Sequence, residues 1–147
     1  MVDDLRVSRE VEDSNRRMLR ARDAMDRNYT EPLDIPALAR IAFVSEAHFI
    51  RTFRSTFGET PHRYLQRRRV ERAMAMLRQT PGSITDICMA VGFTSLGTFS
   101  RTFRGIVGES PRDYRARNPP ITHVPTHFSM AWTRPSSFGE GNRQPGQ

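Results

Sequence analysis

The chain has 147 residues, and its 23 basic side chains against 16 acidic ones give a formal net charge of +7. All 23 basic residues are arginine, and a hydrophobic content of 37% is enough for one modest core or two small ones. No apolar run approaches the ~18 residues of a membrane span, residues 1–13 lack the apolar segment of a secretory signal, and the single cysteine, Cys88, excludes a disulfide framework and a multi-cysteine zinc site.

The first predicted helix spans about residues 14–28. Its apolar side chains, Met18, Ala21 and Met25, recur at the three- and four-residue spacing of one helix face. The preceding segment, residues 1–13, is polar and is expected to form a flexible N-terminus.

The next segment predicts two short helices separated by a tight turn. Asp34 is a suitable N-cap for the first helix, and Ser45 is a suitable N-cap for the second. In the second helix Phe49 and Phe53 recur one turn apart on a buried face, and Gly58 ends the helix.

A longer connecting helix is predicted from Pro61 to about Arg78, because Thr60 provides a cap and proline is tolerated in the first helical turn. Its apolar stripe consists of Val70, Ala73, Met74 and Leu77. At ~1.5 Å per residue this helix is about 27 Å long. That length is enough to hold two small helical units about one turn of DNA apart, ~34 Å from centre to centre.

Residues 48–64 and 98–114 repeat one another, with nine of 17 positions identical at an offset of 50. The identical pairs are Phe49/Phe99, Arg51/Arg101, Thr52/Thr102, Phe53/Phe103, Arg54/Arg104, Gly58/Gly108, Glu59/Glu109, Pro61/Pro111 and Tyr64/Tyr114. The chain therefore contains one structural unit twice.

The repeat predicts a second pair of short helices. Ser83 caps the first of them, Thr94 or Ser95 starts the second, and Gly108 ends it. A last short helix begins at Ser110.

The predicted fold is all-α, with about seven helices and an irregular C-terminal tail. Two helix-turn-helix subdomains, residues 14–60 and 81–117, are joined by the connecting helix at residues 61–80. Prolines and glycines exclude a long helix from residues 118–147. Aromatic side chains alternate at Phe128–Trp132, so the tail is expected to be partly docked or disordered.

The charge is unevenly distributed. Residues 1–34 carry a net charge of −2, residues 35–117 carry +8, and residues 118–147 carry +1. An even preference for arginine codons would not produce this difference. The middle segment is therefore the candidate electrostatic footprint for nucleic acid.

If Phe49 and Phe53 face the core, the polar face of their helix points outward and can enter a DNA major groove. Arg51 and Arg101 occupy equivalent outward positions in the two units. Arginine is the side chain best suited to bidentate hydrogen bonding with guanine O6 and N7. The alternative is a pair of salt bridges on a solvated surface, but repetition in the same frame favours contact with DNA.

Phosphate contacts are expected from a second set of side chains. Arg54 and Arg104 lie about one turn further along the two helices, and His48 lies near the first of these faces. Ser83 and Thr85 lie at the start of a helix, where free amides and the helix dipole favour an anion.

The segment ICMAVGF at residues 87–93, followed by Phe99, Phe103 and the run from Gly108 to Arg115, resembles the C-terminal DNA-binding region of AraC/XylS-type transcription regulators. The resemblance covers about residues 15–117. It implies seven helices and two recognition helices that read successive major grooves on one face of the DNA. The base-reading positions that it implies are Ala47, Ile50, Arg51, Gly97, Thr98, Ser100 and Arg101.

Two departures from the family pattern have consequences. Phe43 stands where the family commonly has a glycine in the turn, whereas Gly92 keeps that residue in the second unit. Because a bulky residue at positive φ is costly, the first turn is expected to be altered and its helix to be placed differently. Ala47 and Gly97 offer little to read a base with, so readout is expected to rest heavily on the two arginines.

The resemblance implies a cytoplasmic, nucleoid-associated transcription regulator. It is expected to be an activator whose partners are double-stranded DNA and RNA polymerase. The chain has no room for a separate ligand-binding domain, so it resembles the short stand-alone members, which act as monomers on asymmetric sites. An alternative is a protein-interaction or ligand-sensing module that uses the aromatic tail. A small-molecule effector has no direct support in the sequence.

No catalytic site, cofactor or metal site is predicted. Carboxylate pairs at catalytic spacing, Ser/His/Asp groupings and glycine-rich phosphate loops are absent from the sequence. His123 and His127 are four residues apart, but Pro125 between them prevents the helix that would place both on one face.

Overall fold

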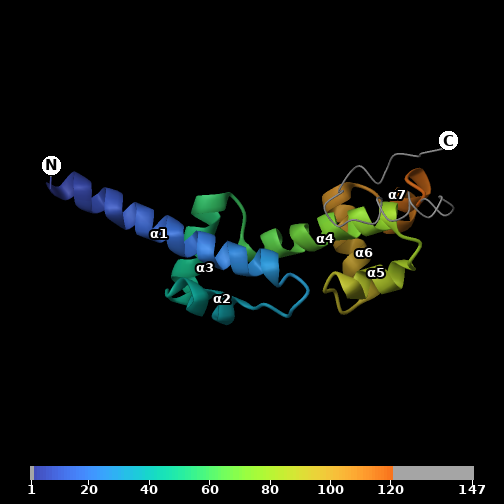
Figure 1. The fold of residues 1–147 in the computed structure, drawn as a ribbon, viewed down its shortest axis with the longest axis horizontal. Helices are drawn as coiled ribbons and strands as arrows, with labels where there is room; N and C mark the ends of the chain where they lie inside the picture. Colours follow the sequence, from blue (N-terminus) through green and yellow to red (C-terminus); the bar gives the residue numbers. More distant parts are fainter. Residues whose placement is uncertain (1, 121–147) are drawn as a thin grey trace, which may run out of the picture. The chain divides into compact units, whose positions relative to one another are not determined.

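The computed structural model describes residues 2–120, which form seven α-helices (Figure 1). The helices are α1 (Val2–Arg27), α2 (Ile35–Ala42), α3 (Glu46–Phe57), α4 (Pro61–Gln79), α5 (Ile84–Ala90), α6 (Leu96–Val107) and α7 (Pro111–Arg117). The all-α, seven-helix prediction is confirmed for this part of the chain. None of the described helices has both the length and the apolar character needed to span a membrane. The predictions for the aromatic tail, Phe128–Trp132, lie outside the described residues.

Helix α1 is longer than predicted. It begins at Val2 rather than near Ser14, so the prediction of a frayed segment is wrong for residues 2–13. Every residue from Asp3 to Asp13 is exposed, and the prediction failed because it used a buried apolar stripe as the mark of a helix. Acidic residues in the first turn complement the helix dipole, and Arg17 pairs with Asp13 one turn away at 2.9 Å.

Six of the described helices begin at a predicted capping residue. In each case the side-chain oxygen of the cap accepts a hydrogen bond from the backbone amide three residues later, at 3.0–3.2 Å. The capping residues are Asp34, Ser45, Thr60, Ser83, Ser95 and Ser110. Local side-chain chemistry therefore sets where these helices start, and Ser95 rather than Thr94 starts α6.

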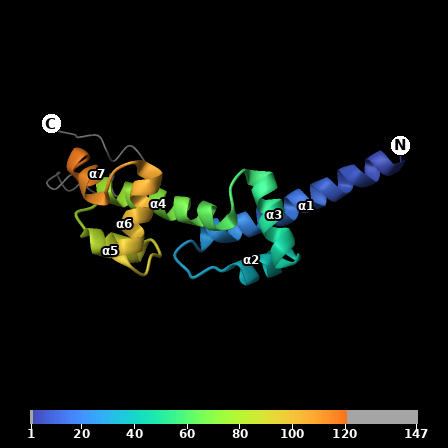
Figure 2. The same cartoon turned by 180° about the vertical axis from the view of Figure 1, so that it is seen from behind.

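The chain divides into two compact units, Met1–Arg68 and Arg69–Gln147, and the boundary falls within α4. In the first unit α1 packs against both α2 and α3 (Figure 2). Its core is built on Met18, Met25, Leu38, Phe49 and Phe53, all nearly or fully buried. The ring of Phe53 also meets Tyr64 edge-on, with 5.8 Å between the ring centroids.

The second unit repeats this core around α6. Phe99 and Phe103 are fully buried, and the ring of Phe103 meets Tyr114 edge-on at 5.7 Å between centroids. The second half of α4 contributes Val70, Ala73, Ala75 and Leu77. Met74 is only half-buried, so that member of the predicted stripe is wrong.

The turn of the first unit begins with the same hydrogen-bond pattern as the turn of the second. Phe43 adopts the left-handed conformation with φ of 58°, and Gly92 has φ of 103°. In both turns two consecutive amides bond back to the preceding helix: Phe43 to Arg40 and Val44 to Ala39, and Gly92 to Met89 and Phe93 to Cys88, all at 3.1 Å. The prediction that Phe43 alters the first turn is therefore wrong for these hydrogen bonds.

Phe43 is accommodated because its side chain does not need to be buried. Phe43 is 70% exposed, and the guanidinium of Arg20 lies over its ring at 5.6 Å from the centroid. The Phe43 carbonyl accepts a hydrogen bond from Nη1 of Arg17 at 2.8 Å. These contacts with α1 hold the turn in a conformation that costs a non-glycine residue about 1–2 kcal/mol.

Candidate nucleic-acid interface

The outer face of α3 carries the predicted base-reading residues of the first unit. Ala47, Ile50 and Arg51 are exposed, and Ile50 is 38% exposed. Phe49 and Phe53 are fully buried on the opposite side of the same helix. The inward positions inferred from the sequence are therefore correct, and α3 presents the predicted polar face to solvent.

Helix α6 presents an equivalent face. Gly97, Thr98 and Arg101 are exposed, whereas Ser100 is half-buried. Ser100 is therefore less accessible to a base edge than the other three predicted residues.

The two repeated arginines are not held by acidic neighbours. Within residues 2–120, neither Arg51 nor Arg101 takes part in an ion pair. The salt-bridge alternative for these positions therefore has no support in the described structure. Arg101 makes one polar contact, from Nη2 to Oγ1 of Thr98 at 3.4 Å.

The predicted phosphate-binding side chains are also at the surface. His48, Arg54 and Arg104 are exposed on α3 and α6. Ser83 and Thr85 are exposed at the start of α5, where the Ser83 hydroxyl oxygen already accepts a hydrogen bond from the Asp86 amide at 3.0 Å.

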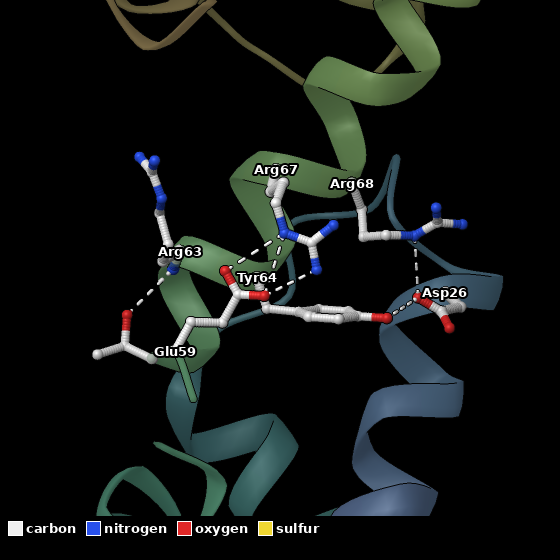
Figure 3. Close-up of polar contacts among 7 residues, drawn as sticks. Asp26, Glu59, Arg63, Tyr64, Arg67 and Arg68 are labelled. Atoms are coloured by element: carbon white, nitrogen blue, oxygen red, sulfur yellow. Dashed lines mark hydrogen bonds and ion pairs between the residues drawn. The ribbon is translucent and has the colours of Figure 1, made fainter. Parts of the chain in front are cut away.

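A polar network at the start of α4, which the sequence prediction missed, joins α4 to the end of α1 and to the loop that follows α3 (Figure 3). The Tyr64 hydroxyl donates to Oδ1 of Asp26 at 2.7 Å, and Nε of Arg68 donates to the same oxygen at 3.2 Å. Nε and Nη2 of Arg67 donate to the two carboxylate oxygens of Glu59 as a bidentate pair, and the Arg67 guanidinium lies over the Tyr64 ring at 5.2 Å from the centroid. Burial, followed by the hydrogen bond to Asp26, raises the pKa of Tyr64 to about 12.

The second unit contains a related network. Arg117 pairs with Glu109, and this hydrogen-bonded pairing lowers the pKa of the Glu109 carboxyl. Nη1 of Arg78 donates to the Tyr114 hydroxyl. Arg115 donates to the carbonyls at the C-terminal end of α4, reaching Leu77 at 3.2 Å and Thr80 at 2.9 Å, and also to the carbonyl of Gly82.

The pairs of Arg67 with Glu59 and of Arg117 with Glu109 could have been found by extending the repeat. Arg67 and Arg117 are separated by the same 50 residues as Glu59 and Glu109, but they lie just beyond the compared segments. Within residues 2–120, no group of three or more His, Cys, Asp or Glu side chains is arranged to hold a metal ion. The helices and exposed faces define a tandem helix-turn-helix fold of the DNA-binding class.

Comparison with known proteins identifies the family. A family model described as "Helix-turn-helix domain" matches residues 38–117. The bifunctional transcriptional activator/DNA repair enzyme AdaA of Bacillus subtilis is 41% identical over 68 residues, which are 46% of this chain and 32% of that protein. The chain spans about a third or less of the length of the curated relatives that it matches.

Solved structures match over much more of their length. An AraC-type transcriptional regulator from Chromobacterium violaceum superposes with a TM-score of 0.66 at 33% identity, covering 74% of this chain and 97% of that one. The DNA-binding domain of AdpA, solved in complex with a target DNA, superposes with a TM-score of 0.65 at 30% identity, covering 68% and 90% of the two chains. The chain belongs to the AraC-type helix-turn-helix family of DNA-binding transcription regulators.

Proposed function

We propose that the chain is a sequence-specific transcription regulator that reads duplex DNA with α3 and α6. The observation that carries this proposal is the pair Arg51 and Arg101, which are exposed at equivalent positions and, within the described residues, have no acidic partner. A guanidinium without an acidic partner can donate two parallel hydrogen bonds to a guanine edge. The related AdpA domain was solved in complex with a target DNA, which supports DNA binding by a domain of this fold.

The two readers differ, which favours an asymmetric binding site. Ala47 and Ile50 of α3 correspond to Gly97 and Ser100 of α6. Apolar side chains suit the thymine methyl group, whereas a hydroxyl can hydrogen-bond to more than one base. One chain therefore carries two recognition helices with different side chains, and a monomer is sufficient to recognise an asymmetric sequence.

Phosphate contacts would fix the register of the protein on the duplex. They would come from Arg54, Arg104 and His48, and from Ser83 and Thr85 at the start of α5. Such contacts position the protein without carrying sequence information. They also make affinity fall steeply with salt, because each neutralised phosphate releases condensed counterions.

We infer further that the regulator activates transcription by contacting RNA polymerase. Support comes from the related AdaA protein, which is described as a transcriptional activator. Transcription with purified polymerase, from a template that carries the bound site, tests whether the protein activates or represses. Activation predicts more transcript when the protein is added, and a decrease in transcript would show repression instead.

The base-reading role is tested by Arg101→Ala, measured on the DNA site enriched from a random pool and on random duplex. Removing one bidentate guanine contact is expected to cost about 1–3 kcal/mol on the enriched site, with a much smaller loss on random DNA. Arg9→Ala on the exposed first part of α1 is the charge-matched control and should leave the ratio of the two affinities unchanged. Equal weakening on both DNAs by Arg101→Ala would contradict the proposal.

A further inference from the structure

Arg101 is restrained by its own helix. Its Nη2 donates to Oγ1 of Thr98 at 3.4 Å, and a Cβ atom placed on Gly97 would lie 3.4 Å from its Nη1. The guanidinium therefore lies over the first turn of α6, and a Cβ atom on Gly97 would be in ordinary van der Waals contact with it.

Thr98 is itself held in place. Its Oγ1 accepts a hydrogen bond from the Ser95 hydroxyl at 3.1 Å, and its backbone amide donates to Oγ of Ser95 at 3.1 Å. Ser95 is the N-cap of α6, so a continuous polar chain runs from the cap through Thr98 to the guanidinium. The restraint on Arg101 is thus anchored to the start of the helix.

The equivalent arginine of the first unit has no such restraint. His48 stands in place of Thr98. The structure joins His48 to Ser45 only through its backbone amide, at 3.2 Å. Within residues 2–120, Arg51 has no hydrogen bond or ion pair from its side chain. The internal repeat therefore contains one restrained arginine and one unrestrained arginine in the same frame.

We propose that Thr98 is a positioning residue, which holds the Arg101 guanidinium for base reading and makes α6 the more discriminating of the two recognition helices. The proposal rests on the base-reading function proposed above. It also gives Thr98 a role other than contact with a base.

The restraint is compatible with reading guanine. A guanidinium has five N–H donors, and the bond to Thr98 uses one of them. Four donors remain, and a guanine edge requires two. Because a long arginine side chain loses rotamer freedom on binding, holding it beforehand reduces that loss and favours the complex.

The direct test removes only the Thr98 hydroxyl. Thr98→Val keeps the side-chain shape and the backbone amide that donates to Ser95, so the helix cap remains. Discrimination between the enriched site and a site altered at the base that depends on Arg101 is expected to fall about three- to tenfold, the range of one weak hydrogen bond. Thr98→Ser restores the hydroxyl and should restore discrimination.

A double-mutant cycle separates positioning from direct contact. If Thr98 acts through Arg101, Thr98→Val should have no further effect on discrimination in the Arg101→Ala background. A full effect in that background would mean that Thr98 touches the DNA itself and would overturn the proposal. Thr102→Val, half-buried on the same helix, is the matched control, and thermal unfolding verifies that every variant folds.

Side-chain NMR relaxation of the free protein tests the restraint without DNA. The Nε–H of Arg101 is expected to be more ordered than that of Arg51, and Thr98→Val should remove the difference. If the Nε–H groups of Arg101 and Arg51 are equally ordered in the wild-type protein, the positioning role of Thr98 is overturned. The base-reading function can still hold in that case, and it is supported if Arg101→Ala reduces discrimination between the two DNA sites. If Arg101→Ala instead weakens binding equally on all DNAs, Arg101 does not read a base. The base-reading function and the positioning role are then both contradicted.

Discussion

Tyr64 of the first unit and Tyr114 of the second occupy equivalent positions, but their hydroxyl groups are used in opposite ways. Tyr64 donates to the carboxylate of Asp26 at the end of α1, whereas Tyr114 accepts from the guanidinium of Arg78 at the end of α4. Both rings pack edge-on against the central phenylalanine of their unit. The apolar frame is therefore duplicated, while the polar contacts at its edge have diverged.

A second difference lies one residue further along. Leu65 is buried in the first unit, and its counterpart Arg115 bonds to backbone carbonyls around the end of α4. The C-terminal carbonyls of a helix need partners, and an arginine that supplies three donors satisfies them from outside the helix. The same position of the repeat is thus a buried core residue in one unit and a hydrogen-bond donor to a helix C-terminus in the other.

The largest effect that this comparison predicts is at Arg115. Arg115→Ala removes three hydrogen bonds and leaves half-buried carbonyls without a protein donor, so it should lower the free energy of unfolding by about 2–3 kcal/mol. Urea unfolding measures the change. Arg112→Ala, exposed on the same helix, should change stability by less than about 0.5 kcal/mol. A similar small change for Arg115→Ala would show that the carbonyls are satisfied by water.

A smaller effect is expected at Tyr64, and it depends on pH. The pKa of Tyr64 is raised to about 12 in the folded protein from 10.0, so the folded state holds this proton more tightly than the unfolded state. The protonated Tyr64 hydroxyl therefore contributes fully to the free energy of unfolding below pH 10, and this contribution is lost as the pH rises towards 12. Tyr64→Phe should cost about 1–2 kcal/mol at neutral pH.

The pH dependence is read from the difference between wild type and Tyr64→Phe in urea unfolding. That difference should shrink between pH 10 and 12, because the phenylalanine variant has no hydroxyl to titrate. A difference that stays constant over this range would mean that the bond to Asp26 does not favour the protonated hydroxyl.

The smallest effect is expected at Phe43, in the turn of the first unit. Phe43→Gly relieves the left-handed strain but loses the contact with Arg20 and adds freedom to the unfolded chain, so stability should stay within about 0.5 kcal/mol of wild type. Gly92→Ala places a Cβ at positive φ and should cost about 1–2 kcal/mol. A loss above about 1 kcal/mol for Phe43→Gly in thermal or urea unfolding would show that the exposed ring is needed for the turn.

Local chemistry explains what the sequence could predict. Capping residues such as Asp34 and Ser45, and the glycine stop at Gly58, act within a few residues of the chain, so their patterns are visible in the sequence. The buried faces of α3 and α6 were predicted because their phenylalanines recur at helical spacing and appear twice.

Contacts between distant segments explain what the sequence could not predict. Tyr64 and Asp26 are 38 residues apart, and Arg115 and Leu77 are also 38 apart, so no local pattern joins them. The first part of α1 was missed because it buries no apolar stripe. At α6 the base-reading positions followed from a family resemblance, but the restraint of Arg101 by Thr98 required coordinates.

The central claim is that two unlike helices of one chain read one asymmetric site. Selection of bound duplex from a random pool, with the sequence of the enriched DNA as the readout, tests it most directly. The account predicts a single asymmetric site with two separated blocks of defined bases, and one block should lose definition when the selection is repeated with Arg101→Ala. Enrichment of a palindrome, or of no defined sequence, would contradict it.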